Sequence, residues 1–237
     1  MTDTPAPSTF GQGLLASLPI VLGYFPIAFS FGIGATKIGL SSAEAIFLST
    51  VMYSGAAQFL ALSLIAGGAP ILISAVTLIA MGLRHLLYAP ALLSRAGAKA
   101  PRRFALAWSY GLTDEVFGAA IGQLARGRVF SEPFMLGLGL GAYGAWVSGT
   151  AVGALIGGSG LAQWPALDAA LGFLLPALFL SLLLSILSRA QFVTIATAIF
   201  VTVLLTFLIS GTVGLLAGMI AGALAGTFGG RQSKDAI

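Results

Sequence analysis

The stretch FALAWSYGLTDEVFGAAIGQLA, residues 104–125, is apolar and long enough to cross a membrane, yet Asp114 and Glu115 stand side by side near its centre. A helix crosses a hydrocarbon core with about 20 apolar residues. Runs of that length recur along the chain, whose 237 residues are 58% hydrophobic and only 8% charged. Soluble domains carry about 25% charged residues. The composition therefore predicts a protein that lies in the lipid bilayer.

The apolar runs predict helices and not a β-barrel. Backbone groups in lipid must bond to one another, so only helices and closed barrels cross a membrane. Barrel strands alternate polar and apolar residues, whereas the runs here are continuously apolar. We therefore predict an all-α polytopic membrane protein that forms a single integral membrane domain over residues 1–237. Its polar tails, residues 1–12 and 230–237, are expected to be too short for a soluble domain.

Turn residues and charges divide the chain into about seven expected transmembrane spans. These are residues 13–36, 43–67, 70–94, 104–125, 133–157, 166–188 and 191–229. The last tract is interrupted by SGTVG, residues 210–214, so an eighth span is the alternative. A weak parallel internal repeat, in which residues 57–64 match residues 177–184, is a further expectation, because some transporters are built from such repeats.

The basic residues predict an orientation. Cytoplasmic connections of membrane proteins are rich in Lys and Arg. We therefore attribute the net charge of +4 to membrane topology and not to a surface that binds nucleic acid. The largest basic cluster follows the third expected span and consists of Arg95, Lys99, Arg102 and Arg103. Placing it in the cytoplasm puts the amino terminus outside. With seven spans, seven basic residues lie inside and three outside. With eight spans, five would lie on each side, so the charge distribution favours seven.

Four ionisable residues lie deep inside these apolar segments, namely Arg84, His85, Asp114 and Glu115. A charge at a helix centre costs about 2.5–3.5 kcal/mol on insertion scales, so such residues face a bundle interior or a wet cavity. On a helix, Asp114 lies about 100° from Glu115 and shares its face with Tyr110. The two acids are therefore expected to have different roles. A buried ion pair with Arg84 that only fixes helix packing is the structural alternative.

Other polar or helix-breaking residues occur at membrane depth. In the second expected span, Gln58 and Ser54 share one face beside Gly55. Prolines inside helices leave carbonyl groups without donors, and broken helices are tolerated where they line a cavity, as in transporters. The expected broken-helix positions are Pro19, Gly23, Pro26, Gly55 and Pro176. Together these features favour a cavity over ordinary kinks.

Five motifs carry a resemblance to a known family. They are PIVLGYFPIAFSFG at 19–32, SGAAQF at 54–59, RHLLYAP at 84–90, LTDEVF at 112–117 and YGAWVSGTAVGALIG at 143–157. The chain resembles the AzlC family, the large subunit of bacterial branched-chain amino acid exporters. The resemblance implies a multi-pass protein of the bacterial inner membrane that exports valine, leucine or isoleucine with a small, four-span AzlD-type partner subunit. Gly82 departs from the family, in which an Asn is frequent, and this leaves the exact substrate open.

We hypothesise that the protein is a proton antiporter. A small aliphatic zwitterion needs an apolar pocket and partners for its ammonium and carboxylate groups. Glu115 or Asp114 is expected to receive the ammonium, and Arg84 or amides near Gly23 and Gly55 the carboxylate. The other acid, or His85, would carry the proton. The residues predicted to bind substrate or couple protons are Asp114, Glu115, Arg84, His85, Gln58, Ser54 and Tyr110.

Three other functions are alternatives. A passive channel or facilitator for small solutes needs the same cavity without a proton-coupled acid. An intramembrane serine protease would use Ser159 of the GGSG stretch with His85, but that stretch is a common linker, so we predict no enzymatic activity. A scaffold for a partner is disfavoured by the intramembrane charges. The sequence carries no phosphate loop, metal-binding motif or cysteine, and no cofactor is predicted.

Overall fold

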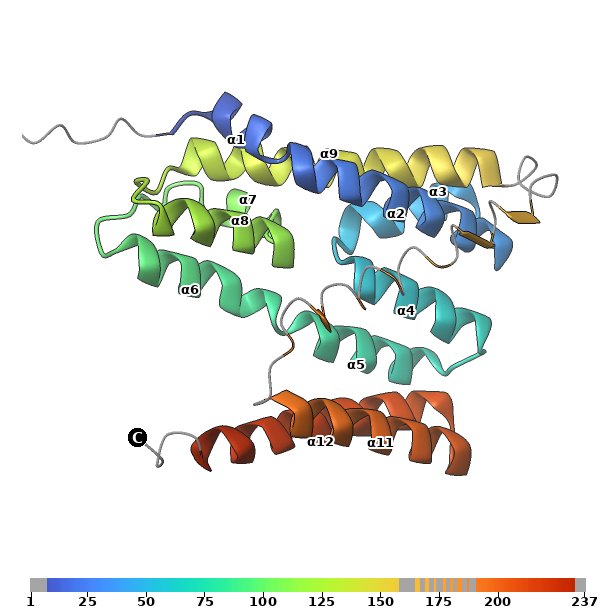
Figure 1. Ribbon diagram of the computed structural model, residues 1–237. Helices are drawn as coiled ribbons and strands as arrows, with labels where there is room; N and C mark the ends of the chain where they lie inside the picture. Colours follow the sequence, from blue (N-terminus) through green and yellow to red (C-terminus); the bar gives the residue numbers. More distant parts are fainter. Residues whose placement is uncertain are drawn as a thin grey trace, which may run out of the picture. The chain divides into compact units, whose positions relative to one another are not determined.

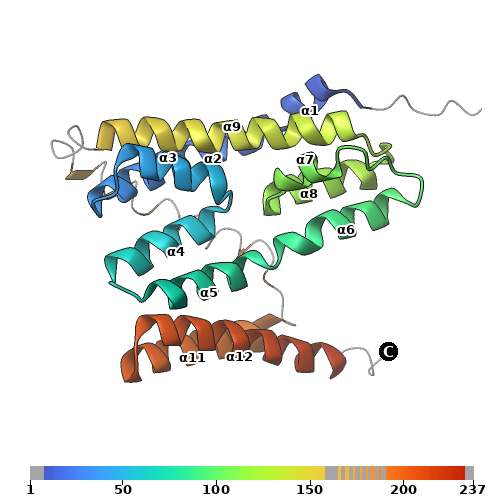
Figure 2. The same cartoon turned by 180° about the vertical axis from the view of Figure 1, so that it is seen from behind.

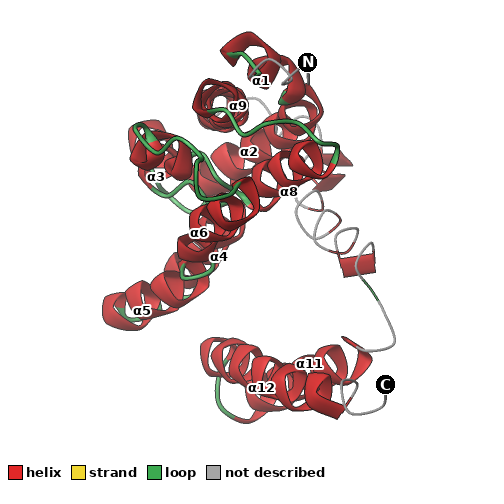
Figure 3. Cartoon of the chain, turned by 90° about the vertical axis from the view of Figure 1, so that its left-hand side faces the viewer, coloured by secondary structure: helices red, strands yellow, loops and turns green. Residues whose placement is uncertain are grey.

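The computed structural model describes residues 8–157, 165–166, 169–170, 173, 177, 180, 183–184, 187 and 191–232. The chain divides into two compact units, Met1–Leu174 and Leu175–Ile237. Within the described residues every regular element is a helix, and Figure 3 accordingly draws only helices and loops. The prediction of an all-α membrane protein is confirmed.

Three long apolar stretches form the frame of the first unit. They are α2 (Leu18–Lys37), the continuous pair α5 (Ile71–Gly82) and α6 (His85–Ala96), and α9 (Glu132–Gly157). Among the described residues these three are long and apolar enough to cross a membrane. The short helix α1 (Phe10–Ala16) precedes α2, and both run alongside α9 (Figure 1). The three stretches correspond to the expected spans 13–36, 70–94 and 133–157.

The expected span 43–67 is a hairpin of two half-helices, which we call hairpin 1. It consists of α3 (Ser42–Val51) and α4 (Gly55–Ala66). Ala45 in α3 and Leu62 in α4 belong to one buried cluster with Phe31 and Ala154. In a single straight helix they would lie about 25 Å apart. The chain therefore turns back at residues 52–54, which we call tip 1.

The expected span 104–125 is also a hairpin, which we call hairpin 2. It consists of α7 (Ala105–Tyr110) and α8 (Asp114–Ala125), joined by residues 111–113, or tip 2. The backbone N–H of Phe104 donates to Glu132 over 2.8 Å, and a connection of six residues joins Ala125 to Glu132. Both ends of the hairpin therefore lie at the start of α9, as Figure 2 shows. An unbroken helix would hold them about 33 Å apart.

The two hairpins enter from opposite ends of the first unit and meet near its middle. Hairpin 1 packs beside the end of α2, where Phe31 and Ala35 contact it, whereas hairpin 2 starts where α9 begins. The hydroxyl of Tyr143, in the middle of α9, and that of Tyr110, beside tip 2, both donate to the Thr50 carbonyl beside tip 1. Each hairpin follows a long span, and the segments α1–α4 and α5–α8 run in opposite directions. Half of the second copy of the expected parallel repeat, residues 177–184, lies outside the described residues.

The last tract forms two helices in the second unit. They are α11 (Phe192–Leu208) and α12 (Gly211–Gln232), which meet at the SGTVG interruption. A Cβ atom on Gly218 would lie 1.8 Å from the Thr202 hydroxyl, and one on Gly214 would lie 2.3 Å from the Thr206 hydroxyl. The glycines of α12 therefore serve internal packing against α11, since small residues let helix backbones approach closely.

The hairpins change the expected orientation of the first unit. Because hairpin 2 returns to the end that it enters, the basic residues on both sides of it lie at the same end. That end holds Arg95, Lys99, Arg102, Arg103, Arg126 and Arg128, whereas Lys37 lies at the other end. The start of α1 is bound to the basic end, because the Ser131 hydroxyl donates to the Ser8 carbonyl. Under the positive-inside rule, this arrangement predicts that the start of α1 lies in the cytoplasm, which is the opposite of the orientation expected from the sequence.

This orientation predicts which loops a reagent reaches. The chain has no cysteine, so single cysteines can replace Ala69, between α4 and α5, and Ala98, between α6 and α7. A membrane-impermeant maleimide is expected to label Ala69→Cys in intact cells and Ala98→Cys only after lysis. The reverse pattern would restore the orientation inferred from the sequence.

Candidate functional site

The candidate site lies where the two hairpin tips meet, and tyrosine side chains hold the tips together. The last carbonyls of a helix lack intrahelical donors. In α3, these carbonyls accept hydrogen bonds from side chains of other helices. The hydroxyl of Tyr110 donates to the Thr50 carbonyl and lies 3.3 Å from that of Val51. Tyr143 of α9 donates to the same Thr50 carbonyl over 3.0 Å. The carboxyl end of α3 is therefore satisfied by side chains of the protein.

The chain has five tyrosines, and all of them lie around this junction: Tyr24, Tyr53, Tyr88, Tyr110 and Tyr143. The ring of Tyr53, in tip 1, lies 5.1 Å from that of Tyr143 and 6.5 Å from that of Tyr24. Tyr53 is only 8% exposed, and its buried hydroxyl has no hydrogen-bond partner among the described residues. An unpaired buried hydroxyl is costly, so this group is available to a ligand or to water.

Glu115 is held at the start of α8. The hydroxyl of Tyr24, from α2, donates to the Glu115 carboxylate and lies 2.6 Å from the Thr113 hydroxyl. Thr113 also accepts a bond from the Val116 N–H over 3.4 Å, as the residue that caps α8. A helix N-terminus carries a partial positive charge that favours carboxylates. The position of Glu115 at membrane depth therefore has a local electrostatic cause.

Asp114 points to a different helix. Its carboxylate lies 3.1 Å from the guanidinium of Arg84, and both side chains are 42% exposed. The hydroxyl of Tyr88 also donates to Asp114, and the ring of His85 lies 5.3 Å from that of Tyr88. The two acids thus have different partners, as the helical spacing predicts. The ion pair is not sealed from its surroundings, which disfavours the purely structural alternative.

Arg84 and His85 stand at the break between α5 and α6. His85 Nδ1 lies 3.2 Å from the Gly82 carbonyl, so the ring is held by the end of α5. Among the described residues, no three His, Asp or Glu side chains gather as metal ligands would. The arrangement offers a cation, carboxylates and hydroxyls in one half-exposed region.

Gln58 is fully buried and spans hairpin 1. Its amide N–H donates to the Met52 carbonyl over 2.5 Å, and its amide oxygen accepts from the Trp146 indole over 3.0 Å. Ser54 precedes α4 without capping it through its side chain. A Cβ atom on Gly55, the first residue of α4, would lie 2.6 Å from the Trp146 ring. Gln58 therefore fixes tip 1, while the first N–H groups of α4 have no side-chain cap.

The predicted break in the first long helix is wrong. Helix α2 runs without interruption from Leu18 to Lys37; Pro19 lies in its first turn, where proline costs no bond, and Pro26 lies inside it. Gly23 and Pro26 are exposed and point away from the buried face that carries Tyr24. The actual interruption is at Ser17, between α1 and α2. Pro176 and Ser159 lie outside the described residues.

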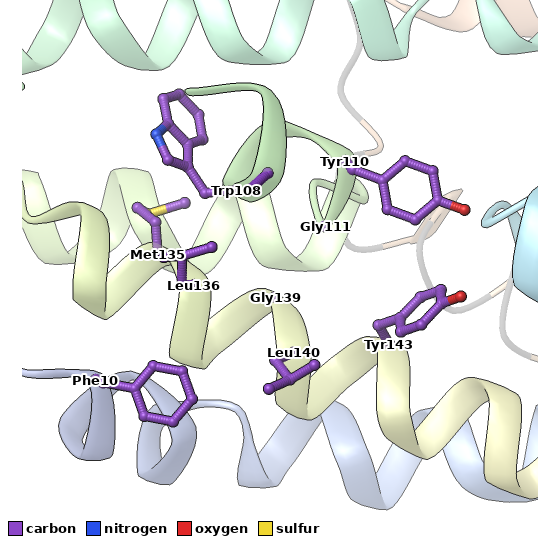
Figure 4. Close-up of a pocket in the computed structure, with 10 residues that line it drawn as sticks. Phe10, Trp108, Tyr110, Gly111, Met135, Leu136, Gly139, Leu140 and Tyr143 are labelled. Atoms are coloured by element: carbon purple, nitrogen blue, oxygen red, sulfur yellow. The ribbon is translucent and has the colours of Figure 1, made fainter. Parts of the chain in front are cut away.

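An apolar cavity of about 340 Å³ borders tip 2 (Figure 4). It lies among α1, α7 and α9, and the rings of Tyr110 and Tyr143 stand at one side of it. Its lining consists of Phe10, Ala107, Trp108, Tyr110, Gly111, Met135, Leu136, Gly139, Leu140 and Tyr143. Small-molecule pockets have volumes of about 300–1,000 Å³ and are mostly apolar. The cavity is large enough for an aliphatic side chain.

Several residues of the site were not predicted from the sequence. Tyr24, Tyr53, Tyr143 and Trp146 stand in apolar segments whose contacts the sequence does not reveal. Glu132 was also missed: it is 4% exposed and accepts from the Trp108 indole over 3.0 Å. The sequence contains one signal for these residues: its few polar aromatic residues are concentrated in the expected membrane segments.

Comparison with known proteins gives consistent results. The family model described as AzlC protein matches residues 19–159, which include both hairpins. The inner membrane protein YgaZ of Escherichia coli (strain K12) is 44% identical over 201 residues, 84% of this chain and 82% of that protein. An uncharacterized membrane protein of Archaeoglobus fulgidus is 41% identical over 176 residues, 74% of each chain. Another, from Helicobacter pylori (strain ATCC 700392 / 26695), is 28% identical over 141 residues, 60% of this chain and 61% of that protein. No solved structure matches the chain.

Proposed function

The chain belongs to the AzlC family, and from this we propose that it exports branched-chain amino acids across the bacterial inner membrane by proton antiport. It is a membrane protein, and its family and relatives support a role in transport rather than in enzymatic catalysis. The inner membrane is named for the Escherichia coli relative, and we extend that location to this chain.

The observation that carries the proposal is the meeting of two opposed hairpins at half-exposed ionisable groups. Transporters bind substrates at mid-depth with half-helices whose N-termini face the ligand. Here α4 and α8 both begin at the meeting point, and Glu115 and Asp114 stand in the first turn of α8. A passive facilitator needs a path but no titratable group, so these acids favour a coupled transporter.

Each part of a branched-chain amino acid has a matching group. The ammonium pairs with Glu115 and with the faces of nearby tyrosine rings, since aromatic faces attract cations. The carboxylate accepts from the uncapped N–H groups at the start of α4, with Tyr53 as a further donor. The aliphatic side chain fits the apolar cavity beside Tyr110, whose volume is about 340 Å³.

Proton antiport assigns the carboxylates two tasks. Asp114 is compensated by Arg84 over 3.1 Å, whereas Glu115 accepts from the neutral hydroxyl of Tyr24. Glu115 therefore alternates between a proton and the substrate ammonium, and Asp114 maintains the local structure. His85 and Tyr88 line the approach to Asp114.

A small AzlD-type membrane subunit completes the transporter. Within Ile71–Ala96, only 6% of the apolar 18-residue stretch is buried. This leaves a wide apolar surface on α5 and α6. Such a surface suits lipid or a partner helix, and the family resemblance favours the partner.

The decisive experiment is transport of labelled leucine, valine and isoleucine into inside-out membrane vesicles, with and without the small subunit. An acidic lumen is expected to drive accumulation, and a protonophore is expected to abolish it. Equal transport after collapse of the gradient, without accumulation, would favour the facilitator. No transport of any of the three amino acids in the presence of the partner would overturn the proposed substrate.

A further inference from the structure

We infer that hairpin 2 is the moving gate of the transporter and that the Tyr24 hydroxyl holds it closed only while Glu115 is ionised. The inference rests on the proposed function, because it assigns a moving part to the same site. It concerns how the site opens and does not depend on which amino acid is carried.

Hairpin 1 is fastened by neutral, buried groups. Gln58, which is fully buried, bonds to the Met52 carbonyl and to the Trp146 indole. The hydroxyls of Ser49, in α3, and Thr150, in α9, lie 2.6 Å apart, and both residues are fully buried. None of these groups changes its charge within the range of physiological pH. These fastenings of hairpin 1 therefore do not respond to protons.

Hairpin 2 is fastened near its tip largely through its two carboxylates, while its base is held by the bonds of Phe104 and Trp108 to Glu132. Tyr24 donates to Glu115, and Tyr88 and Arg84 bond to Asp114. Hydrogen bonds to an ionised carboxylate are about twice as strong as neutral ones, so protonation of the acid weakens the fastening. The bond from Tyr110 to the Thr50 carbonyl is neutral and remains.

The packing of hairpin 2 is also looser than that of hairpin 1. Helix α4 buries six of its 12 residues, whereas α8 buries only two of its 12, Val116 and Ala120. Cβ atoms on Gly118 and Gly122 of α8 would meet nothing within 4 Å. Elements with few buried apolar contacts are the ones that open locally at low cost in free energy. The hairpin that can move more easily is thus hairpin 2, which carries the two acids.

The surroundings of Glu115 single it out as the switch. The titratable and charged groups near it are Tyr24 of α2, Tyr53 of tip 1, Arg84, His85 and Tyr88 of the α5–α6 span, Asp114 of α8, and Tyr110 and Tyr143 beside the tips. Arg84 is paired with Asp114, and among the described residues Glu115 has no salt bridge. His85 bonds to the Gly82 carbonyl at the end of α5. Within the described part of the chain, the charge of Glu115 is therefore balanced by the dipole of α8 and the hydroxyl of Tyr24.

The gate suits an exporter in the orientation derived above. A proton from the outside water forms an O–H bond on the Glu115 carboxylate, the bond from Tyr24 weakens, and hairpin 2 opens towards the cytoplasm. The proton is released to cytoplasmic water, and the substrate ammonium pairs with the carboxylate. Tyr24 then bonds to Glu115 again, and hairpin 2 closes behind the substrate.

The test measures exposure of each hairpin with single cysteines in the full chain, in membranes and without substrate. Ala120→Cys reports on α8 and Ala57→Cys on α4, because these alanines are 2% and 3% exposed. Thiol reactivity itself varies with pH, so the ratio of labelling at position 120 to labelling at position 57 is the readout. Acidification is expected to raise this ratio by about fivefold or more, the lower end of ordinary coupling between sites. A ratio that stays constant would overturn the inference.

Tyr24→Phe assigns the effect to the hydroxyl. This variant removes the donor without removing the ring, so the labelling ratio is expected to be high at all pH values, and Glu115→Gln is expected to lose the same pH dependence. Tyr143→Phe is the matched control, since Tyr143 bonds to a neutral carbonyl, and it is expected to keep the pH dependence. The role of Tyr24 would be refuted if Tyr24→Phe kept the pH dependence of the parent. It would also be refuted if Tyr143→Phe lost as much of the pH dependence as Tyr24→Phe. Because no substrate is present, failed export with a correct labelling pattern would refute only the proposed substrate.

Discussion

Replacing Glu115 by glutamine is expected to abolish export driven by a pH gradient while the protein remains folded in the membrane. Glutamine cannot take up or release a proton, but its amide oxygen can still accept a bond from Tyr24, which donates to Glu115 in the parent. Gradient-driven accumulation of labelled leucine in inside-out vesicles should fall by more than about tenfold, because the coupling between proton and substrate is lost. Exchange of labelled for unlabelled leucine without a gradient should fall less.

The neighbouring acid supplies a matched control. Asp114→Asn removes the carboxylate that pairs with Arg84 but leaves Glu115 able to take up and release a proton. This variant is therefore expected to transport more slowly and to keep its dependence on the pH gradient. Glu115→Asp, which retains a titratable group, should recover part of the coupling. Undiminished gradient-driven export by Glu115→Gln would remove Glu115 from the proposed mechanism.

The start of a helix explains why two adjacent acids occur within the apolar stretch of residues 104–125. Asp114 and Glu115 are the first two residues of a helix that begins at membrane depth, with Thr113 as its cap. A capping residue followed by acids is the ordinary signature of a helix start. That signature was visible in the sequence, but the apolar run around it predicted one continuous span. Hydropathy measures how apolar a segment is, and it does not distinguish one full crossing from two antiparallel half-crossings.

The same limit explains which parts of the site could be predicted. Ionisable residues in an apolar run stand out because they cost free energy in lipid, so Arg84, Asp114 and Glu115 were found. Tyr24 and Tyr53 cost little in such segments, and only the three-dimensional contacts reveal their role. The prolines of α2 misled the interpretation because a helix can retain proline in its first turn, as at Pro19, and here continues through a proline in its interior, Pro26.

Substitution of Gly153 is expected to have the largest effect on stability. A Cβ atom at this position in α9 would lie 2.0 Å from the Phe29 carbonyl oxygen and 2.8 Å from its carbon. These are backbone atoms of α2, so relief requires the two long helices to move apart. Overpacking of this kind costs about 1–3 kcal/mol and sometimes more. Gly153→Ala should therefore lower the thermal unfolding midpoint in detergent by several degrees, and Gly153→Leu should prevent accumulation of folded protein.

Gly144→Ala is the control on the same helix, because a Cβ atom there would meet nothing within 4 Å. Alanine favours helix over glycine by about 1 kcal/mol, so this midpoint should be unchanged or raised. Equal midpoints for the two alanine variants would contradict the close α2–α9 contact. The contact also bears on the site, since α2 carries Tyr24 and α9 carries Trp146, whose rings lie 5.1 Å apart. Gly153→Ala protein that does fold should consequently show weakened pH control of hairpin 2, because moving α2 displaces the hydroxyl that Glu115 accepts.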